Sequence, residues 1–153
     1  MKKIKILVAA LAISALLVVA LVPAALADDA GYSGTGRLHA QGTGIAQIKG
    51  KGEVWGTARA GLLAITDNGG SARIEVSGEG RKVQVGNTVI YYGFDGRFFV
   101  AGRDIVVRLE GARVDLTAVG TGTAFLKGHG KVWINGHLIG LWPVNGGSFN
   151  YGP

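Results

Sequence analysis

A stretch of 18 residues occurs twice in this chain and constrains its fold more than any other feature. Residues 38–55 and 116–133 align without a gap and are identical at 11 of 18 positions. Segments of this composition would share roughly two or three identities by chance, so we interpret the pair as an internal duplication. A repeated structural unit is therefore expected.

Both copies alternate with a period of two residues. Four glycines of each copy fall on one side of an extended chain, while threonine, lysine and tryptophan residues fall on the other. A helix with this many interior glycines would lose about 1 kcal/mol per glycine relative to alanine. The copies are therefore predicted to be strands that bend over a core, or approach a neighbouring sheet closely, at their glycines.

Residues 1–27 have the pattern of a signal peptide. Three lysines precede an apolar run over residues 6–22, and an A-x-A cleavage pattern ends at Ala27. Cleavage after Ala27 is expected, and the protein is predicted to be secreted or held in the cell envelope. The alternative is an uncleaved anchor, because the apolar run approaches membrane-spanning length. Membrane contact is expected only through this segment, if it is retained.

Charge and cysteine content argue against several classes of function. The chain has 16 basic and 10 acidic residues, and removal of the three lysines in residues 1–27 leaves 13 − 10 = +3. This modest charge predicts no nucleic-acid partner. The chain has no cysteine, so it relies on neither disulfides nor thiolate metal ligands, and no cofactor is expected.

After the signal peptide, the sequence divides into a flexible lead-in at residues 28–36, a β domain at residues 37–143 and a C-terminal tail at residues 144–153. Frequent turn signals predict about ten to twelve short antiparallel strands. The predicted fold is all-β, a single antiparallel β-sandwich or closed barrel with an internal duplication. A β-solenoid is the alternative, although that fold requires tandem copies of a repeat at a short period. The tail is expected to be a loose end, or else a strand added to a neighbour's edge.

Two-residue hairpin turns are predicted at three dipeptides, Asp95-Gly96, Glu110-Gly111 and Asn135-Gly136. The first turn would pair Tyr91 with Val100 and make both faces of its hairpin apolar. Such a hairpin lies at the centre of the core, or meets a ligand or a second chain. The candidate residues of this interaction surface are Tyr91, Tyr92, Phe98 and Phe99.

The turn at Asn135 and Gly136 predicts a possible ligand surface on the second copy. Its register would pair His129 with Trp142 and place both on the face that carries Trp133, while Trp55 holds the equivalent place in the first copy. Tryptophan offers a large flat ring and an N–H donor, which sugar binding requires. The candidate ligand-binding residues are Trp55, His129, Trp133 and Trp142. The alternative is that these rings pack against the tail or the opposite sheet.

No metal site is expected, because the same register puts His129 and His137 on opposite faces. The usual nucleophile-elbow, zinc-protease and phosphate-loop motifs are also missing from the sequence. We therefore predict an exported, non-enzymatic structural or surface-interaction protein of the cell envelope or extracellular space. Its partner would be a second copy or a cell-surface polymer.

Two other classes of function remain open. One is a binding module for a carbohydrate or a small apolar ligand, built on the tryptophan face. The other is an enzyme, which requires that carboxylates distant in sequence meet in the fold. The acidic residues considered for such a pair are Glu53, Glu75, Glu79 and Asp115.

Overall fold

The computed structural model describes residues 35–153, which form five β-strands and their connections. The strands are β1 (Gly36–Asp67), β2 (Arg73–Val85), β3 (Thr88–Ile134), β4 (His137–Leu141) and β5 (Gly147–Tyr151). The predicted signal peptide, residues 1–27, and residues 28–34 of the predicted lead-in lie outside the described residues. No helix long and apolar enough to cross a membrane occurs within residues 35–153. The all-β prediction is confirmed.

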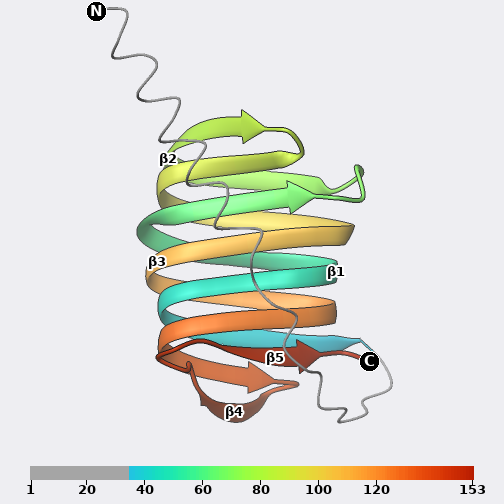
Figure 1. Ribbon diagram of the computed structural model, residues 1–153, viewed down its shortest axis with the longest axis vertical. Helices are drawn as coiled ribbons and strands as arrows, with labels where there is room; N and C mark the ends of the chain where they lie inside the picture. The colour runs from blue at the N-terminus through green and yellow to red at the C-terminus, as the bar shows by residue number, and fades with distance from the viewer. Residues whose placement is uncertain (1–34) are drawn as a thin grey trace, which may run out of the picture.

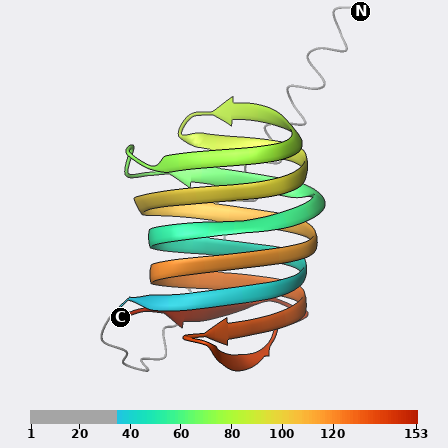
Figure 2. The same ribbon diagram turned by 180° about the vertical axis from the view of Figure 1, so that it is seen from behind.

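Strands β1 and β3 are wound around each other as a coil (Figure 1; Figure 2 from behind). Ala118 of β3 pairs with Leu38 on one side and with Val54, sixteen residues later, on the other. Leu38 in turn lies between Ala118 and Ile134. Turns of β1 therefore alternate with turns of β3, and neighbouring turns run antiparallel. In a solenoid, successive turns of one segment would be neighbours, whereas here a turn of the other strand separates them.

The five strands form one antiparallel sheet that does not close on itself. Strand β2 pairs only with β3 and forms one edge, while β4 and β5 pair with β3 at the other end of the coil. The predicted closed barrel is therefore wrong. The predicted count of ten to twelve short strands is also wrong, because β1 and β3 run for 32 and 47 residues without a break.

The core lies between the two walls of the coil (Figure 1). Alternate residues of every turn point inward, and consecutive cross-strand partners form buried rows. On one wall these are Leu38, Ala118, Val54 and Val100, and on the other Leu126, Ala46, Leu109 and Leu63, all at most 1% exposed. Each buried leucine or valine contributes about 1.5–3 kcal/mol relative to exposure, so this continuous core stabilises the coil.

Glycines of neighbouring turns lie against one another where the sheet bends. Gly44 pairs with Gly128, and both have positive φ angles, 138° and 133°. A Cβ atom on Gly44 would overlap the carbonyl oxygen of Lys127, and one on Gly128 would overlap that of Thr43. The prediction that the strands bend and approach their neighbours closely at these glycines is therefore confirmed.

The two similar stretches of sequence pair with each other. Residues 38–55 run antiparallel to residues 116–133, with Gly42 opposite Gly130 and Gly52 opposite Gly120. The glycines of one stretch therefore meet those of the other at both bends. A larger side chain in either stretch would push two turns apart, which explains why both carry glycine at equivalent positions.

The predicted hairpins at Asp95-Gly96 and Glu110-Gly111 are wrong. Strand β3 continues without a break through both dipeptides, and Tyr91 pairs with Leu63 and Lys82 rather than with Val100. Gly96 lies at a bend, where it packs on Gly78 of the neighbouring turn. Gly96 therefore serves a close approach of two backbones and not a chain reversal.

The turn at Asn135 and Gly136 is confirmed. Both residues have positive φ angles, 51° and 81°, as a tight hairpin turn requires, and Ile134 pairs with His137 across it. Trp133 also pairs with Leu138, as predicted, and the register departs from the prediction beyond this pair. A bulge at Ile139 puts Lys131 opposite Leu141, and the chain beyond it turns Trp142 into the core.

The C-terminal tail is part of the sheet. Residues 147–151 form β5 and pair with residues 122–126 of β3. The loose end expected for this segment is therefore wrong, and the strand that it adds extends the sheet of its own chain. Gly36, the first residue of β1, lies directly against Gly152, so both ends of the described chain lie at the β4 and β5 end of the coil (Figure 1).

Candidate binding surfaces

Trp55 and Trp133 lie in one outward-facing row that crosses the sheet. Consecutive cross-strand partners form this aromatic row: Trp133, His39, Thr117, Trp55 and Phe99. The His39 ring stacks on Trp133, with centroids 5.1 Å apart and planes 24° apart. The guanidinium carbon of Arg73 lies 5.6 Å from the Phe99 ring centroid. Faces of Trp133 and Phe99 are thus already turned toward neighbouring side chains.

A polar network fixes His39 in this row. His39 Nε2 lies 3.0 Å from Asp115 Oδ1, and Gln41 Nε2 donates a hydrogen bond of 2.7 Å to Asp115 Oδ2. The Asp115 carboxylate therefore has a partner on each oxygen. This arrangement positions the imidazole against Trp133 and leaves less of the carboxylate for other contacts.

The other two predicted ligand residues lie elsewhere. Trp142 is only 3% exposed, and its Nε1 donates a hydrogen bond of 3.0 Å to the Lys131 carbonyl, so it closes the core at the β4 end. His129 lies at a bend of the coil, opposite Thr43. The structure therefore brings together Trp55 and Trp133 but neither Trp142 nor His129.

The four aromatic residues of the predicted interaction surface do not form one surface. Phe98 belongs to the core, where it meets Phe94 with ring centroids 6.4 Å apart, and Tyr91 packs against the same cluster. Tyr92 is half-buried with the Arg81 guanidinium carbon 5.4 Å from its ring centroid. Phe99 is part of the aromatic row. Two of the four residues, Phe98 and Tyr91, thus pack in or against the core, and the other two, Tyr92 and Phe99, lie at separate places on the outer face.

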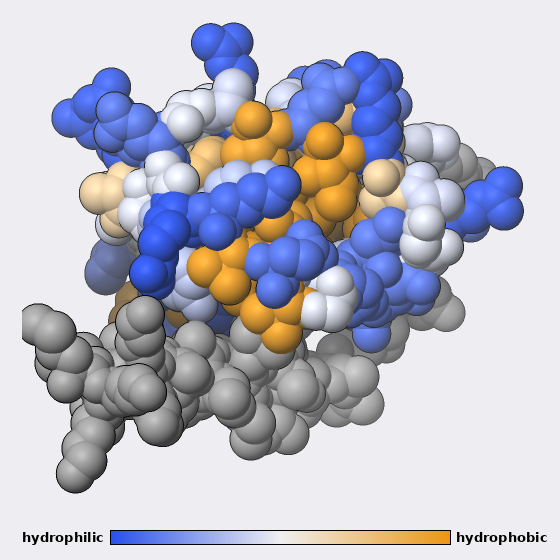
Figure 3. Space-filling view, turned by 90° about the horizontal axis from the view of Figure 1, so that it is seen from above, coloured by the Kyte–Doolittle hydropathy of each residue, from blue (hydrophilic) through white to orange (hydrophobic). Residues whose placement is uncertain are grey.

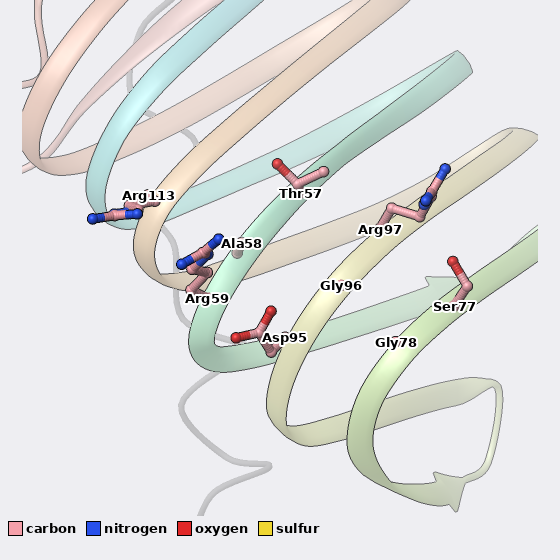
Figure 4. A pocket seen from close by; sticks show the side chains of 9 residues that line it. All are labelled: Thr57, Ala58, Arg59, Ser77, Gly78, Asp95, Gly96, Arg97 and Arg113. Carbon is pink, nitrogen blue, oxygen red and sulfur yellow. The ribbon is translucent and has the colours of Figure 1, made fainter.

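A groove of about 690 Å³ runs along one bend of the coil, and its side chains come from three strands (Figure 4). Arginines on neighbouring turns line it, Arg59 from β1 and Arg97 and Arg113 from β3 (Figure 4). The hydroxyl groups of Thr57 and Ser77 line it as well. We call this the corner groove.

Backbone irregularities occur at or beside two of the arginines that line the corner groove, Arg113 and Arg59. Ala60 and Arg113 have φ angles of 50° and 51°, which residues with a Cβ atom rarely adopt. Each is an extra residue in its turn, because the pairing of β1 with β3 skips it. Strained conformations of this kind cost about 1–3 kcal/mol and occur preferentially at functional sites.

The corner groove is positively charged. Among residues 35–153, no carboxylate forms a salt bridge with Arg59, Arg97 or Arg113, and Asp95 is the acidic residue in the lining. A free guanidinium group presents several N–H donors in a planar fork, which suits carboxylate, sulfate and phosphate groups. The corner groove therefore has the chemistry of an anion-binding site.

A second groove of about 410 Å³ continues the first along the same bend. It shares Arg113 with the corner groove and is lined by Thr43, Asp115 and His129, so His129 enters the candidate site here. Together the grooves cross six neighbouring strand segments, from β2 to the last turn of β3. At about 4.8 Å per strand the track is about 24 Å long. The sequence gives no sign of it, because only the register brings its arginines together.

Within the part of the chain that the structure describes, no group of three or more acidic or histidine side chains is arranged to hold a metal ion. Comparison of the chain with protein-family models, with curated proteins and with solved structures finds no match. Function is therefore inferred from the chemistry of the surfaces described above.

Proposed function

We propose that this protein is an exported, non-enzymatic surface protein that attaches to an anionic polymer of the cell surface through the corner groove. The observation that carries the proposal is the presence of three arginines without salt-bridge partners among residues 35–153, Arg59, Arg97 and Arg113, in one groove. Charge-assisted hydrogen bonds from arginine to an anionic group are roughly twice as strong as neutral ones. Three such groups in line favour a ligand with several negative charges.

The length of the track supports a polymer rather than a small molecule. The two grooves share Arg113 and are open along the bend, so successive anionic groups of an extended chain could contact successive turns. Trp55 lies two residues before Thr57 on the same side of β1, beside the corner groove. An aromatic ring at that place would suit a sugar ring. We therefore favour an anionic polysaccharide, which includes the carbohydrate-binding alternative.

We also propose that the protein is exported by a signal peptide and that its coil arose by internal duplication. The basic start, apolar run and A-x-A pattern of residues 1–27 support a signal peptide. The 11 identities between the two stretches, together with their mutual pairing, support an origin of the coil by internal duplication.

Binding to dextran sulfate, polygalacturonate and neutral dextran tests the proposal. We expect the first two to bind and the neutral polymer to bind at least about tenfold more weakly, with affinity falling as salt is added. Changing Arg59, Arg97 and Arg113 together to glutamine should lower the affinity by about tenfold or more.

A matched triple variant controls for the change in net charge. Changing Arg81, Lys82 and Arg103 to glutamine removes the same charge from exposed sites that do not line the corner groove. This variant should bind nearly as well as the original protein. An equal loss in both triple variants would overturn the proposal, because it would show that overall charge and not the corner groove determines binding.

A further inference from the structure

The exposed large apolar side chains of residues 35–153 lie at the two ends of the coil. At the β2 end, Ile74 and Val85 are 36% and 38% exposed. The β4 end carries four more strongly exposed aliphatic residues within seven positions. These residues, which we call the apolar tip, are Leu138 (57%), Ile139 (51%), Leu141 (69%) and Val144 (62%).

The β2 end is protected against contacts. Apolar side chains gather at its centre within a border of hydrophilic ones (Figure 3). Residues of both signs occur along β2, among them Glu75, Glu79 and Arg81. Lys82 pairs with Tyr91 and so falls on the same side of the sheet as the buried Leu63. Mixed charges and an inward-facing lysine are devices that keep an edge strand from pairing with another chain.

The apolar tip lacks this protection and is firmly held. Residues 137–145 contain no lysine, arginine or acidic residue. Behind the apolar tip, the Trp142 amide donates to the Gly130 carbonyl at 3.0 Å, and the Gly128 amide donates to the Pro143 carbonyl at 3.2 Å. The buried Trp142 ring anchors the segment in the core. Its exposed aliphatic side chains therefore belong to an ordered structure.

Charge is segregated toward the apolar tip. Residues 36–52 and 120–153, which form the turns nearest to it, contain five lysines and arginines and no acidic residue. Residues 53–119 contain eight basic and eight acidic residues. The whole excess of 13 − 8 = +5 in residues 35–153 therefore lies in the half that carries the apolar tip. Lys131 pairs directly with Leu141.

We propose that the apolar tip docks on an anionic lipid surface. Exposed aliphatic side chains would enter the region between headgroups and acyl chains, while the surrounding lysines and arginines would contact negative headgroups. A second copy fits less well, because a symmetric contact would bring two halves of charge +5 together. Gly36, the first residue of β1, also lies at this end, against Gly152 (Figure 1). This surface is separate from the corner groove.

A fluorescent label on a single cysteine tests the geometry, because the natural chain has none. In the full chain, Leu141→Cys and, at the opposite end, Ile74→Cys would each be labelled with an environment-sensitive dye. Vesicles of phosphatidylcholine with phosphatidylglycerol should shift the emission of the Leu141→Cys label to the blue and raise its intensity. The Ile74→Cys label should not change. Equal responses, or a response at Ile74→Cys alone, would overturn the proposal.

Charge substitutions test the energetics. Ile139→Asp with Leu141→Asp should weaken binding to the mixed vesicles by about tenfold or more. Ile74→Asp with Val85→Asp is the matched control and should leave binding unchanged. Every variant retains residues 1–34, so a difference in binding reports the substituted positions. The folded state of each variant is checked by its circular dichroism spectrum.

Two further readouts separate the alternatives. Vesicles of phosphatidylcholine alone should bind at least about tenfold more weakly, because they offer no net negative charge to the lysines and arginines near the apolar tip. Light scattering on the original protein without vesicles should give the same mass at every protein concentration. A mass that grows with concentration in the original protein but not in Leu141→Asp would mean that the apolar tip binds a second copy and not a lipid surface. Loss of vesicle binding in the corner-groove triple variant alone would likewise overturn the apolar tip as the docking site.

Discussion

Gln47 and Phe125 pair with each other at the one position where a residue of the first similar stretch faces its own counterpart in the second. They are 125 − 47 = 78 residues apart, which is the offset between the aligned stretches. The other partners lie symmetrically about them, as Gly42 with Gly130 and Gly52 with Gly120 show. Phe125 is apolar, whereas Gln47 carries an amide, and Gln47 is only 8% exposed. Its Oε1 has no hydrogen-bond partner among the described residues.

Replacing this amide should stabilise the protein. A buried polar atom without a partner costs about 1–3 kcal/mol, so Gln47→Leu should raise the free energy of unfolding by about 1 kcal/mol. Urea denaturation measures the change. Gln41→Leu is the control, because Gln41 is exposed and hydrogen-bonded to Asp115, and it should bring no gain. A lower stability of Gln47→Leu would mean that the amide makes an interaction in solution.

The paired glycines at the bends should tolerate no side chain. Gly44→Ala places a Cβ atom on the Lys127 carbonyl oxygen at a φ angle of 138°, and should lower the free energy of unfolding by about 3 kcal/mol or more. Gly140→Ala is the matched control, because a Cβ atom at Gly140 would have no other atom within 4 Å beyond its chain neighbours. Thermal or urea unfolding compares the two. Similar stabilities of the two variants would contradict the close packing of turns.

Tyr151 should make the fold sensitive to alkali. Burial raises the pKa of Tyr151 from 10.0 to about 12. Between these values the folded state keeps the phenol proton and the unfolded state loses it, so stability is complete below pH 10 and falls as pH rises toward 12. The total loss is at most about 2–3 kcal/mol. Tyr151→Phe should weaken this dependence in urea titrations at several pH values. An unchanged dependence would contradict the burial of the Tyr151 phenol.

Tryptophan fluorescence should report ligand binding mainly through Trp55. Trp55 lies beside the corner groove, while Trp133 lies three strands away along the aromatic row, about 14 Å distant. Addition of dextran sulfate should change the emission of the original protein and of Trp133→Phe, and change that of Trp55→Phe much less. The reverse pattern would place the ligand on the His39 and Trp133 end of the row.

The sequence predicts the strands and their inward faces well, because alternation with a period of two is a local property. It predicts the chain reversals less well. Asn135-Gly136 and Asp95-Gly96 give the same local signal, yet only the first is a turn, with both φ angles positive. At Gly96 the glycine is required by Gly78 of a neighbouring turn, which is distant in sequence. A glycine can thus lie in a hairpin turn or at a bend of a continuous strand. Which of the two occurs depends on residues distant in sequence, such as Gly78, and not on the residues beside it.

The candidate site residues are likewise predictable only where a local pattern places them. Trp55 and Trp133 could be placed on one outward face from their equivalent positions in the two stretches. Trp142 could not be placed, because a single bulged residue, Ile139, reverses which side the following residues face. The sequence does not predict the corner groove. Its arginines come from three turns of two strands, and the unusual φ angles at Ala60 and Arg113 have no signal in the sequence.

The alternation of β1 with β3 also limits when this protein can fold. The first turn of β1 has no neighbour until residues 102–120 exist, since Leu38 pairs only with Ala118 and Ile134 and Gly50 with Ile105 and Gly122. A chain made from its N-terminus can pair the second turn of β1 with residues 88–102, but it must keep the first turn unpaired until the next turn of β3 follows. Contacts this distant in sequence close slowly, on a scale of milliseconds to seconds. The interval in which β1 waits for β3 is when the chain is most exposed to proteases and to pairing with other chains.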